Sequence, residues 1–450
     1  MTNRSVSSRI ERTTALRERG ILWSMKRGTV RPTRLALLSL AMLALIVVGG
    51  GLRPVIGDHT TRQAPKNVNG APAASQTSSP ENAGATSPAT QYLFFQIFTY
   101  PLLPAAYTPG QIDPVAQSIV NAVGMTGDKH RKLGLTVGPL TLDDSNAGLI
   151  QIIDDSFAVA EKYNVAIMFH LDDSMFWLNR PDLWSQHQNV EWTSWSGAEA
   201  GPRMLPWYTG PLAPQMCYNS SGIKDVISTL VGQIIGPEIQ KNLAQLKAHG
   251  KSNLFAGIIT GWETMLPDTN PPAGYNALTN LGYSAANPPA DMDTARVGVV
   301  HDFIQFWDQQ FVAAGIDPGK LHTHLATFPL GAANSHAPLV AAFNPFSHAG
   351  FTAYGSSGES FPQIYEAVAA ENANQWGVSE GSNIYPPSAL PGHSGLPDLP
   401  MDQYLAQAYN HGATYVNLLG WQATGTAFYI VLTDPAAIRA YRRFLKGKRL

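Results

Sequence analysis

Short apolar runs alternate with amphipathic stretches along the chain from residue 91 to residue 450. The runs are continuous rather than alternately apolar and polar, which is typical of parallel strands that are covered on both faces. They predict eight strands, at residues 92–98, 133–140, 165–172, 254–262, 321–327, 350–355, 376–381 and 413–421.

Between and after these runs, apolar residues recur at the three-and-four spacing of one helix face. Such sets lie at residues 223–234, 299–307 and 438–445. Eight strands that are each followed by a helix or a loop predict an α/β fold, a single-domain (β/α)8 TIM barrel with long βα loops. An open, doubly wound sheet is the alternative. The Gly-rich phosphate turns that accompany such a sheet, GxGxxG and GxxxxGK[ST], do not occur in the sequence.

The first 90 residues divide into two segments of different composition. Residues 35–52 form an uncharged apolar run after Arg27, Arg31 and Arg34, which is the charge asymmetry of a signal peptide or a signal anchor. Residues 1–57 therefore predict a cytoplasmic basic segment followed by a cleaved signal or a membrane anchor, and both alternatives stay open. The Ala-, Ser-, Thr- and Pro-rich residues 58–90 predict a disordered linker. We expect an extracytoplasmic domain, either secreted or anchored to a membrane by the apolar run.

Composition narrows the class of ligand. Charged residues make up 14% of the 450 residues and the formal net charge is −2, so a basic face for nucleic acid is not expected. The 10 tryptophans suit recognition of a neutral polar ligand by ring stacking. The single cysteine, Cys217, excludes an internal disulfide framework and a Cys-based zinc site. We expect a monomer whose partner is a carbohydrate and whose membrane contact is limited to the N-terminal segment.

Two glutamates fall at the strand ends where (β/α)8 barrels carry their active sites. Glu263 follows the fourth predicted strand in the sequence GWE, and Glu380 ends the seventh in VSEG. These strands lie nearly opposite each other in an eight-stranded barrel, so both side chains can reach one site. Glycosidic hydrolysis needs two carboxyl groups, one to protonate the leaving oxygen and one to attack or to activate water. The pair therefore predicts a glycoside hydrolase.

This arrangement resembles the clan A glycoside hydrolases, retaining enzymes with glutamates at the ends of strands four and seven of the same barrel. The resemblance implies that Glu263 is the acid/base and Glu380 the nucleophile. It also implies that Tyr354, ending the sixth strand, hydrogen-bonds the nucleophile, and that Trp421, ending the eighth, is a platform under the sugar. The sequence departs from the pattern at Trp262, where many members carry an asparagine that binds the sugar 2-hydroxyl.

Other polar residues near the strand ends are candidate sugar contacts, Trp262 among them. His170, Asp172 and Asp173 end the third strand, with capping of the next turn as the alternative role of Asp173. His324 lies in the fifth strand, together with His322. These histidines, with Asp172, also admit a metal site, so a metal-dependent barrel hydrolase is an alternative. We favour histidines that make ordinary hydrogen bonds, with no metal or other cofactor.

The long segment after the third strand, residues 174–220, holds half of the tryptophans. They are Trp177, Trp184, Trp192, Trp195 and Trp207. Long loops in compact domains are usually functional, so we expect two or three of these rings to contact sugar, Trp177 among them, and the others to form a small core. Glu191 and Glu199 in this segment are alternative acids to Glu263. A catalytically inactive barrel that only binds glycan is a further alternative.

Overall fold

The computed structural model describes residues 90–99, 107–202, 210–266, 272–326, 339–355, 360–384 and 398–450. The predicted N-terminal signal or anchor and nearly all of the predicted linker lie outside these residues. Among the described helices, none is both long and apolar enough to cross a membrane. The strands are β1 (Gln91–Phe98), β2 (Arg131–Leu140), β3 (Ala166–Leu171), β4 (Phe255–Thr260), β5 (Leu321–Thr323), β6 (Ala349–Tyr354), β7 (Trp376–Ser382) and β8 (Ala413–Leu418).

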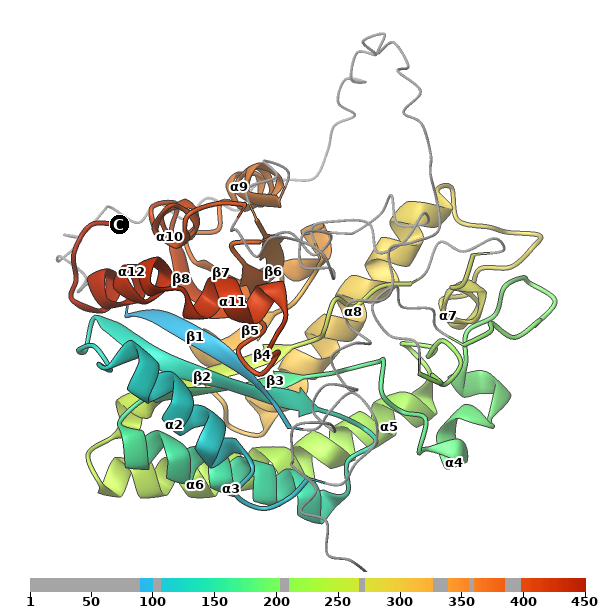
Figure 1. The fold of residues 1–450 in the computed structure, drawn as a ribbon. Coiled ribbons are helices and arrows are strands. Elements are labelled where there is room, and N and C mark those ends of the chain that lie inside the picture. The colour runs from blue at the N-terminus through green and yellow to red at the C-terminus, as the bar shows by residue number, and fades with distance from the viewer. Residues whose placement is uncertain are drawn as a thin grey trace, which may run out of the picture.

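All eight strands run parallel in one sheet, in the order β5-β4-β3-β2-β1-β8-β7-β6 (Figure 1). Backbone hydrogen bonds join the two end strands. The N–H of His348 donates to Leu321 and that of Thr323 donates to His348, and Leu325 continues this ladder by donating to Gly350. The sheet therefore closes into a ring. The prediction of a (β/α)8 barrel is confirmed. The alternative prediction of an open, doubly wound sheet is wrong.

Helices surround this ring. In Figure 1, α2, α3 and α6 lie together below β1 and β2, and α10, α11 and α12 lie above them. The helices of ten residues or more are α2 (Ile112–Val123), α3 (Asn146–Tyr163), α5 (Ser221–Leu230), α6 (Gly236–Ala248), α8 (Met292–Ala313), α9 (Ser360–Ala370) and α12 (Pro435–Leu445). The shorter helices are α4 (Pro181–Trp184), α7 (Tyr275–Asn280), α10 (Met401–Tyr409) and α11 (Ala427–Thr433).

Two apolar cores hold the barrel together. The large core lies between strands and helices, and the small one lies inside the ring: Phe94, Ala166, Met168, Ala256, Ile259 and Tyr415. Two glycines make room for the large rings of the inner core. A Cβ atom on Gly134 would lie 2.1 Å from the Phe94 ring, and one on Gly377 would lie 2.0 Å from the Tyr415 ring. The barrel interior is thus filled with side chains, as (β/α)8 barrels require.

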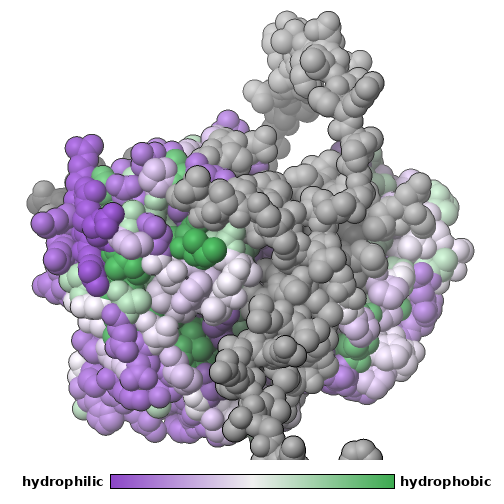
Figure 2. All heavy atoms as spheres, viewed as in Figure 1, coloured by the Kyte–Doolittle hydropathy of each residue, from purple (hydrophilic) through white to green (hydrophobic). Residues whose placement is uncertain are grey.

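The predicted elements differ from the observed ones mainly at their ends. β4 ends at Thr260 and β5 at Thr323, so both are shorter than the apolar runs that predicted them. The predicted helix at 223–234 begins in α5 and continues through the π-helical turn η2 (Val231–Ile235) into α6. The described surface visible in Figure 2 is mostly hydrophilic with scattered apolar residues. The large exposed apolar side chains are Leu281, Val340 and Ile430.

Candidate active site

The chain turns sharply after β4 to place Glu263. Gly261 has a φ of 88° and Glu263 itself has a φ of 53°, a left-handed conformation that is uncommon for a residue with a side chain. Such strained residues cluster at functional sites. The Glu263 side chain is 2% exposed, and its Oε1 lies 2.7 Å from the hydroxyl oxygen of Thr352 on β6. The buried carboxyl of Glu263 is therefore held in place by Thr352, while the backbone of Glu263 adopts a strained conformation.

Glu380 lies within β7 rather than at its last residue. The register of β7 with both neighbouring strands shifts around Ser379, and Glu380 pairs with Thr352 of β6. A bulge of this kind re-aims side chains. The Glu380 side chain is 8% exposed, its Oε1 accepts a 2.5 Å hydrogen bond from the Tyr354 hydroxyl, and the Trp262 side chain donates another. The predicted contact between Tyr354 and Glu380 is present.

Two side chains of β6 contact the two carboxyl groups, and the charge of Glu263 acts on Glu380. Thr352 and Tyr354 lie two residues apart on one face of β6, and they contact Glu263 and Glu380 respectively. Burial first and the Glu263 charge second raise the pKa of Glu380 to about 8, against the hydrogen bonds from Tyr354 and Trp262. Burial, and then both carboxylates, raise the pKa of Tyr354 well above its usual value. Near neutral pH such a pair shares one proton.

Trp262 packs between two aromatic rings and hydrogen-bonds Glu380. Its ring stacks on His170 with centroids 3.9 Å apart and planes 4° apart, and Phe98 lies on it at 6.1 Å and 26°. The side chain is only 5% exposed, so its faces are already covered by protein. In this structure Trp262 positions Glu380 through its indole N–H instead of offering an open surface to a sugar.

Two buried histidines connect the barrel interior to Glu263. His170 Nε2 lies 3.0 Å from His324 Nδ1, and His324 Nε2 lies 2.8 Å from the Thr352 hydroxyl. Burial lowers the pKa of His324 to about 3. Burial and then the His324 charge lower the pKa of His170 well below its usual value, against a backbone hydrogen bond to Gly261. Both rings are neutral at physiological pH, and neither contacts solvent.

The metal-site alternative finds no support in this geometry. In the described part of the chain, no group of three or more His, Cys, Asp or Glu side chains is arranged to hold a metal ion. His170 and His324 use both ring nitrogens for hydrogen bonds within the protein. His322 lies apart from them, against the rings of Tyr415 and His348.

The two aspartates after β3 shape turns. Asp172 Oδ1 accepts hydrogen bonds from the backbone N–H groups of Ser174 and Met175, at 3.0 and 2.6 Å. Asp172 therefore caps this turn, which is the alternative role that the sequence suggested for Asp173. Asp173 Oδ2 instead accepts a 2.6 Å hydrogen bond from Thr264, the residue directly after Glu263. Asp173 thus supports the strained turn after β4.

Trp421 and Trp177 do not lie beside the carboxyl pair. Trp421 is 3% exposed, packs edge-on against Phe95 at 5.0 Å, and donates a hydrogen bond to Ser118 on α2. Trp177 is 1% exposed and belongs to the same outer core. In this structure both rings are buried in the large core, so the packing does not support the predicted sugar contacts.

The chain has the fold of a (β/α)8 barrel, and comparisons with known proteins agree only at that level. No family model matches it, and no curated protein matches its sequence. It is similar to the catalytic domain of a β-amylase from Paenibacillus polymyxa, with 10% identity over 81% of this chain and 100% of that one and a TM-score of 0.49. These values, like the following two, are too low to decide a family or an activity.

Two further solved structures are similar. A β-galactosidase from the psychrophilic Marinomonas ef1 has 10% identity over 78% of this chain and 58% of that one, with a TM-score of 0.45. A tri-modular GH5 (subfamily 4) endo-β-1,4-glucanase from Bacillus licheniformis has 9% identity over 79% and 60%, with a TM-score of 0.40. The chain therefore spans about three fifths of these two proteins. The chemistry has to be argued from the site itself.

Two of the remaining described tryptophans of the segment after β3, Trp184 and Trp195, pack against the large core. Trp184, Trp192 and Trp195 are all partly buried. Trp192 packs against His187, and Trp195 meets Tyr275 of α7 edge-on at 4.9 Å. Figure 1 shows α4 and α7 at the end of the barrel toward which β2 points. This segment therefore lies at the end of the barrel that carries Glu263, and Trp207 lies outside the described residues.

Glu191 is a buried structural carboxyl and not a second acid of the site. It is fully buried and accepts backbone hydrogen bonds from Asn276 in α7 and from Trp192. Burial raises its pKa to about 7, against these backbone hydrogen bonds. Glu199 is exposed on the same segment. The hydrogen bonds of Glu191 serve α7 and its own segment, so the carboxyl pair remains the candidate site.

The raised pKa of Glu191 predicts a loss of stability with rising pH. The folded chain binds this proton more tightly than the unfolded chain, so the stabilisation is complete below about pH 4.5 and is lost as pH rises through about 7. The total is roughly 3 kcal/mol. Glu191→Gln should remove this fall in the free energy of unfolding, measured by urea titration at pH 5 and pH 8. The exposed Glu199→Gln should keep it, and an unchanged fall in Glu191→Gln would contradict the assignment.

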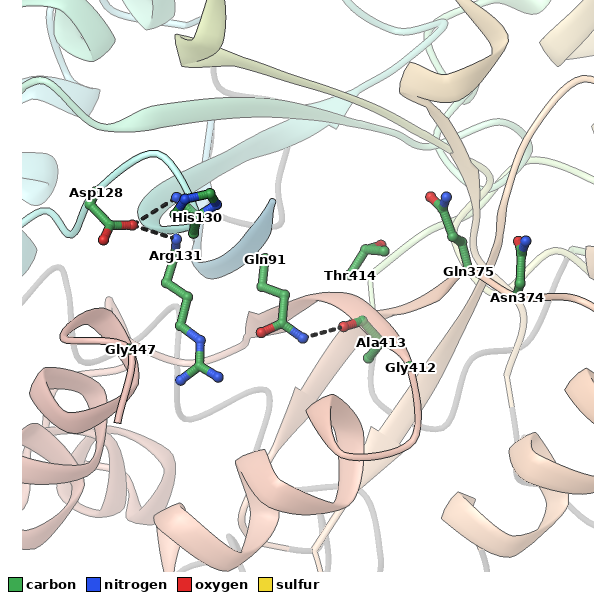
Figure 3. Close-up of a pocket in the computed structure, with 10 residues that line it drawn as sticks. All are labelled: Gln91, Asp128, His130, Arg131, Asn374, Gln375, Gly412, Ala413, Thr414 and Gly447. Carbon is green, nitrogen blue, oxygen red and sulfur yellow. Dashed lines mark hydrogen bonds between the residues drawn. The ribbon is translucent and has the colours of Figure 1, made fainter. Parts of the chain in front are cut away.

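A hollow of about 560 Å³ lies at the opposite end of the barrel (Figure 3). Gln91 and Arg131, the first residues of β1 and β2, line it together with Thr414 and Gln375. The Arg131 guanidinium is already bound to the backbone carbonyls of Phe444 and Lys448. Barrel enzymes react at the C-terminal strand ends, so this hollow is not the candidate active site.

Sequence reasoning missed three residues that shape the site, Thr352, Gln96 and Asn417. Each is fully or almost fully buried. Strand alternation from Tyr354 could have found Thr352, because residues two apart share a strand face. A lone glutamine or asparagine inside an apolar strand is also a signal, since such side chains are rarely buried without hydrogen bonds.

Proposed function

We propose that the protein is a retaining glycoside hydrolase with Glu263 as the acid/base and Glu380 as the nucleophile. The observation that supports this most is the presence of two buried, electrostatically coupled carboxyl groups, one in the turn after β4 and one in β7, each hydrogen-bonded to a hydroxyl group on β6. Burial, and then the charge of Glu263, raise the pKa of Glu380. Two coupled carboxyls at the C-terminal strand ends are the minimum equipment for glycosidic hydrolysis.

The roles follow from the hydrogen bonds. Tyr354 and Trp262 both donate to Glu380, which favours its ionised form and aims one oxygen as a nucleophile. Glu263 would protonate the leaving oxygen while Glu380 attacks the anomeric carbon. A water molecule, deprotonated by Glu263, would then cleave the glycosyl ester and restore both groups.

The substrate would be a neutral oligosaccharide or polysaccharide. Three side chains that contact the pair among the described residues, Thr352, Tyr354 and Trp262, are uncharged. A site that recognised uronic acids or phosphorylated sugars would place Arg or Lys against the substrate. The apolar run 35–52 after basic residues, followed by a polar linker, supports action outside the cytoplasm.

The test is hydrolysis of a panel of neutral glycans, followed by reducing-end release and by NMR of the first anomer formed. We expect product with the anomeric configuration of the substrate. Initial release of the opposite anomer would show an inverting enzyme. Glycan binding without release by the wild type would support the inactive glycan-binding barrel instead.

Metal chelation separates the two-carboxylate mechanism from the metal-dependent alternative. We expect the initial rate to be unchanged after dialysis against EDTA, because the proposed mechanism uses only side chains and water. The measurement is the rate before and after dialysis, with zinc and calcium added back in parallel. A rate that falls with EDTA and returns with one of these metals would contradict the proposal.

A further inference from the structure

A chain of buried hydrogen-bonding groups crosses the barrel interior and ends on the Glu263 carboxyl. His170 contacts Gln96 Oε1 through Nδ1 at 3.1 Å and His324 through Nε2 at 3.0 Å. His324 contacts the Thr352 hydroxyl at 2.8 Å, and that hydroxyl contacts Glu263 at 2.7 Å. Every member is at most 2% exposed. Each proton in the chain must therefore be placed by protein groups.

The hydrogen bonds at the Gln96 end of this series have a fixed donor-to-acceptor direction. Asn417 Nδ2 donates to the Ser379 carbonyl at 2.8 Å and to Gln96 Oε1 at 2.9 Å, while Gln96 Nε2 donates to the Ile97 carbonyl at 3.3 Å. Backbone carbonyls only accept hydrogen bonds. Turning either amide around would set two oxygen atoms against each other. Gln96 Oε1 is therefore an acceptor, so His170 Nδ1 must carry the proton and donate to it.

This direction passes along the chain because a neutral imidazole has one donor and one acceptor nitrogen. With its proton on Nδ1, His170 accepts at Nε2, so His324 must carry its own proton on Nδ1 and accept at Nε2. The Thr352 hydroxyl then donates to His324. Its oxygen is left to accept from Glu263, which can donate only when it is protonated.

We propose that the Gln96–Asn417 amide pair sets the direction of this chain and thereby keeps the shared proton of the carboxyl pair on Glu263. The catalytic meaning of this proposal rests on the proposed function, whereas the direction of the chain does not. Gln96 is a positioning residue, because it acts on Glu263 only through the two histidines and Thr352.

The other ionisable groups around Glu263 act in the same sense. On β7, the hydrogen bonds that Glu380 accepts from Tyr354 and Trp262 favour a charge on it, against the burial and the Glu263 charge that raise its pKa to about 8. A charge on Glu380 disfavours a second one on Glu263. Asp173, which follows β3, reaches the same turn through Thr264, and it is acidic too. Tyr354 on β6 and His324 directly after β5 stay neutral, because burial raises the pKa of the first and lowers that of the second.

This series of hydrogen bonds also accounts for both proton transfers of Glu263, to the leaving oxygen and from the attacking water. When Glu263 gives its proton to the leaving oxygen, the Thr352 hydroxyl can rotate to donate to the new carboxylate. His324 Nε2 then loses its donor, so the ionised state is the less satisfied one. When the attacking water gives a proton to Glu263, the original direction returns.

The first test reads the histidine protons directly and needs no substrate. With ¹⁵N-labelled histidine, two-bond ¹⁵N–¹H NMR correlations show which ring nitrogen carries the proton, and single His170→Gln and His324→Gln variants assign the signals. We expect both rings to carry the proton on Nδ1 in the wild type at pH 6. Protons on Nε2 in both rings would overturn the proposal.

The second test removes the Gln96 amide, which sets the direction of the hydrogen bonds. Gln96→Met keeps an unbranched side chain but offers His170 no oxygen, so we expect a larger Nε2–H population in both histidines. The alkaline limb of the pH–rate profile should move down by about one pH unit, the size expected when one hydrogen bond no longer favours the acid form. A limb that stays in place while the tautomers change would overturn the catalytic part of the proposal.

Matched variants separate this effect from damage to packing. Thr136 pairs with Gln96 in the β1–β2 register, is fully buried, and its hydroxyl has no hydrogen-bond partner among the described residues. Thr136→Val should leave both tautomers and the alkaline limb unmoved. Thr352→Val should shift the limb as Gln96→Met does, and Thr352→Ser should restore it. A wild type without turnover would contradict the proposed function alone, and the tautomers would still decide the direction of the chain.

Discussion

Replacing Glu380 by glycine is expected to reduce turnover of a natural glycan by several orders of magnitude, and added azide is expected to restore part of it. Without the carboxylate no covalent glycosyl intermediate can form. Azide can enter the space that the side chain leaves and attack the anomeric carbon from the same side. The product should then be a glycosyl azide of the configuration opposite to that of the substrate, identified by NMR and mass spectrometry.

Tyr354→Phe is the matched control for this experiment. It removes the 2.5 Å donor to Glu380 but keeps the carboxylate, so turnover should fall less and azide should not form a product. The thermal unfolding midpoint of each variant shows whether the barrel has folded. Turnover near the wild-type rate in a folded Glu380→Gly variant would end the assignment of the nucleophile.

Replacing Glu263 by alanine is expected to give a loss that depends on the leaving group. General acid–base catalysis contributes about 10²- to 10⁴-fold, and a sugar leaving group needs all of it. An activated aryl leaving group departs without a proton, so its glycosylation step should be nearly normal and the glycosyl-enzyme should accumulate. Azide should now intercept that intermediate and give a glycosyl azide that retains the configuration of the substrate.

The two azide products distinguish the roles of the two carboxyls within one set of assays. If Glu263→Ala gave the inverted product and Glu380→Gly the retained one, the roles would have to be exchanged. A loss in Glu263→Ala that is equal for sugar and aryl leaving groups would speak for a structural role, since the strained turn after β4 also depends on this residue.

Much of the fold could be predicted, because a closed parallel sheet leaves a simple pattern. Its strands are buried on both faces, so each becomes a continuous apolar run, and all eight were visible in the sequence. The position of a strand within the ring then follows from its order along the chain. That reasoning was enough to pair Glu263 with Glu380 and to place Tyr354 beside the second of them.

The site residues that were misplaced depend on details that a strand pattern does not contain. The bulge at Ser379 aims Glu380, and nothing in the letters VSEG marks it. Trp421 was assigned to the site as the last residue of the eighth predicted strand, but β8 ends at Leu418, and the ring packs against Phe95 in the large core. Trp262 follows a glycine of positive φ, which turns its ring onto His170.

The left-handed backbone of Glu263 sets stability and activity against each other at one position. Glycine would adopt that conformation without steric penalty and would also spare the barrel a buried acid, so the folded chain alone has no use for glutamate there. A lineage that no longer needed the chemistry would be free to relax this turn. A strained, buried acid in the turn after β4 is thus the cost in stability that the proposed chemistry imposes on the fold.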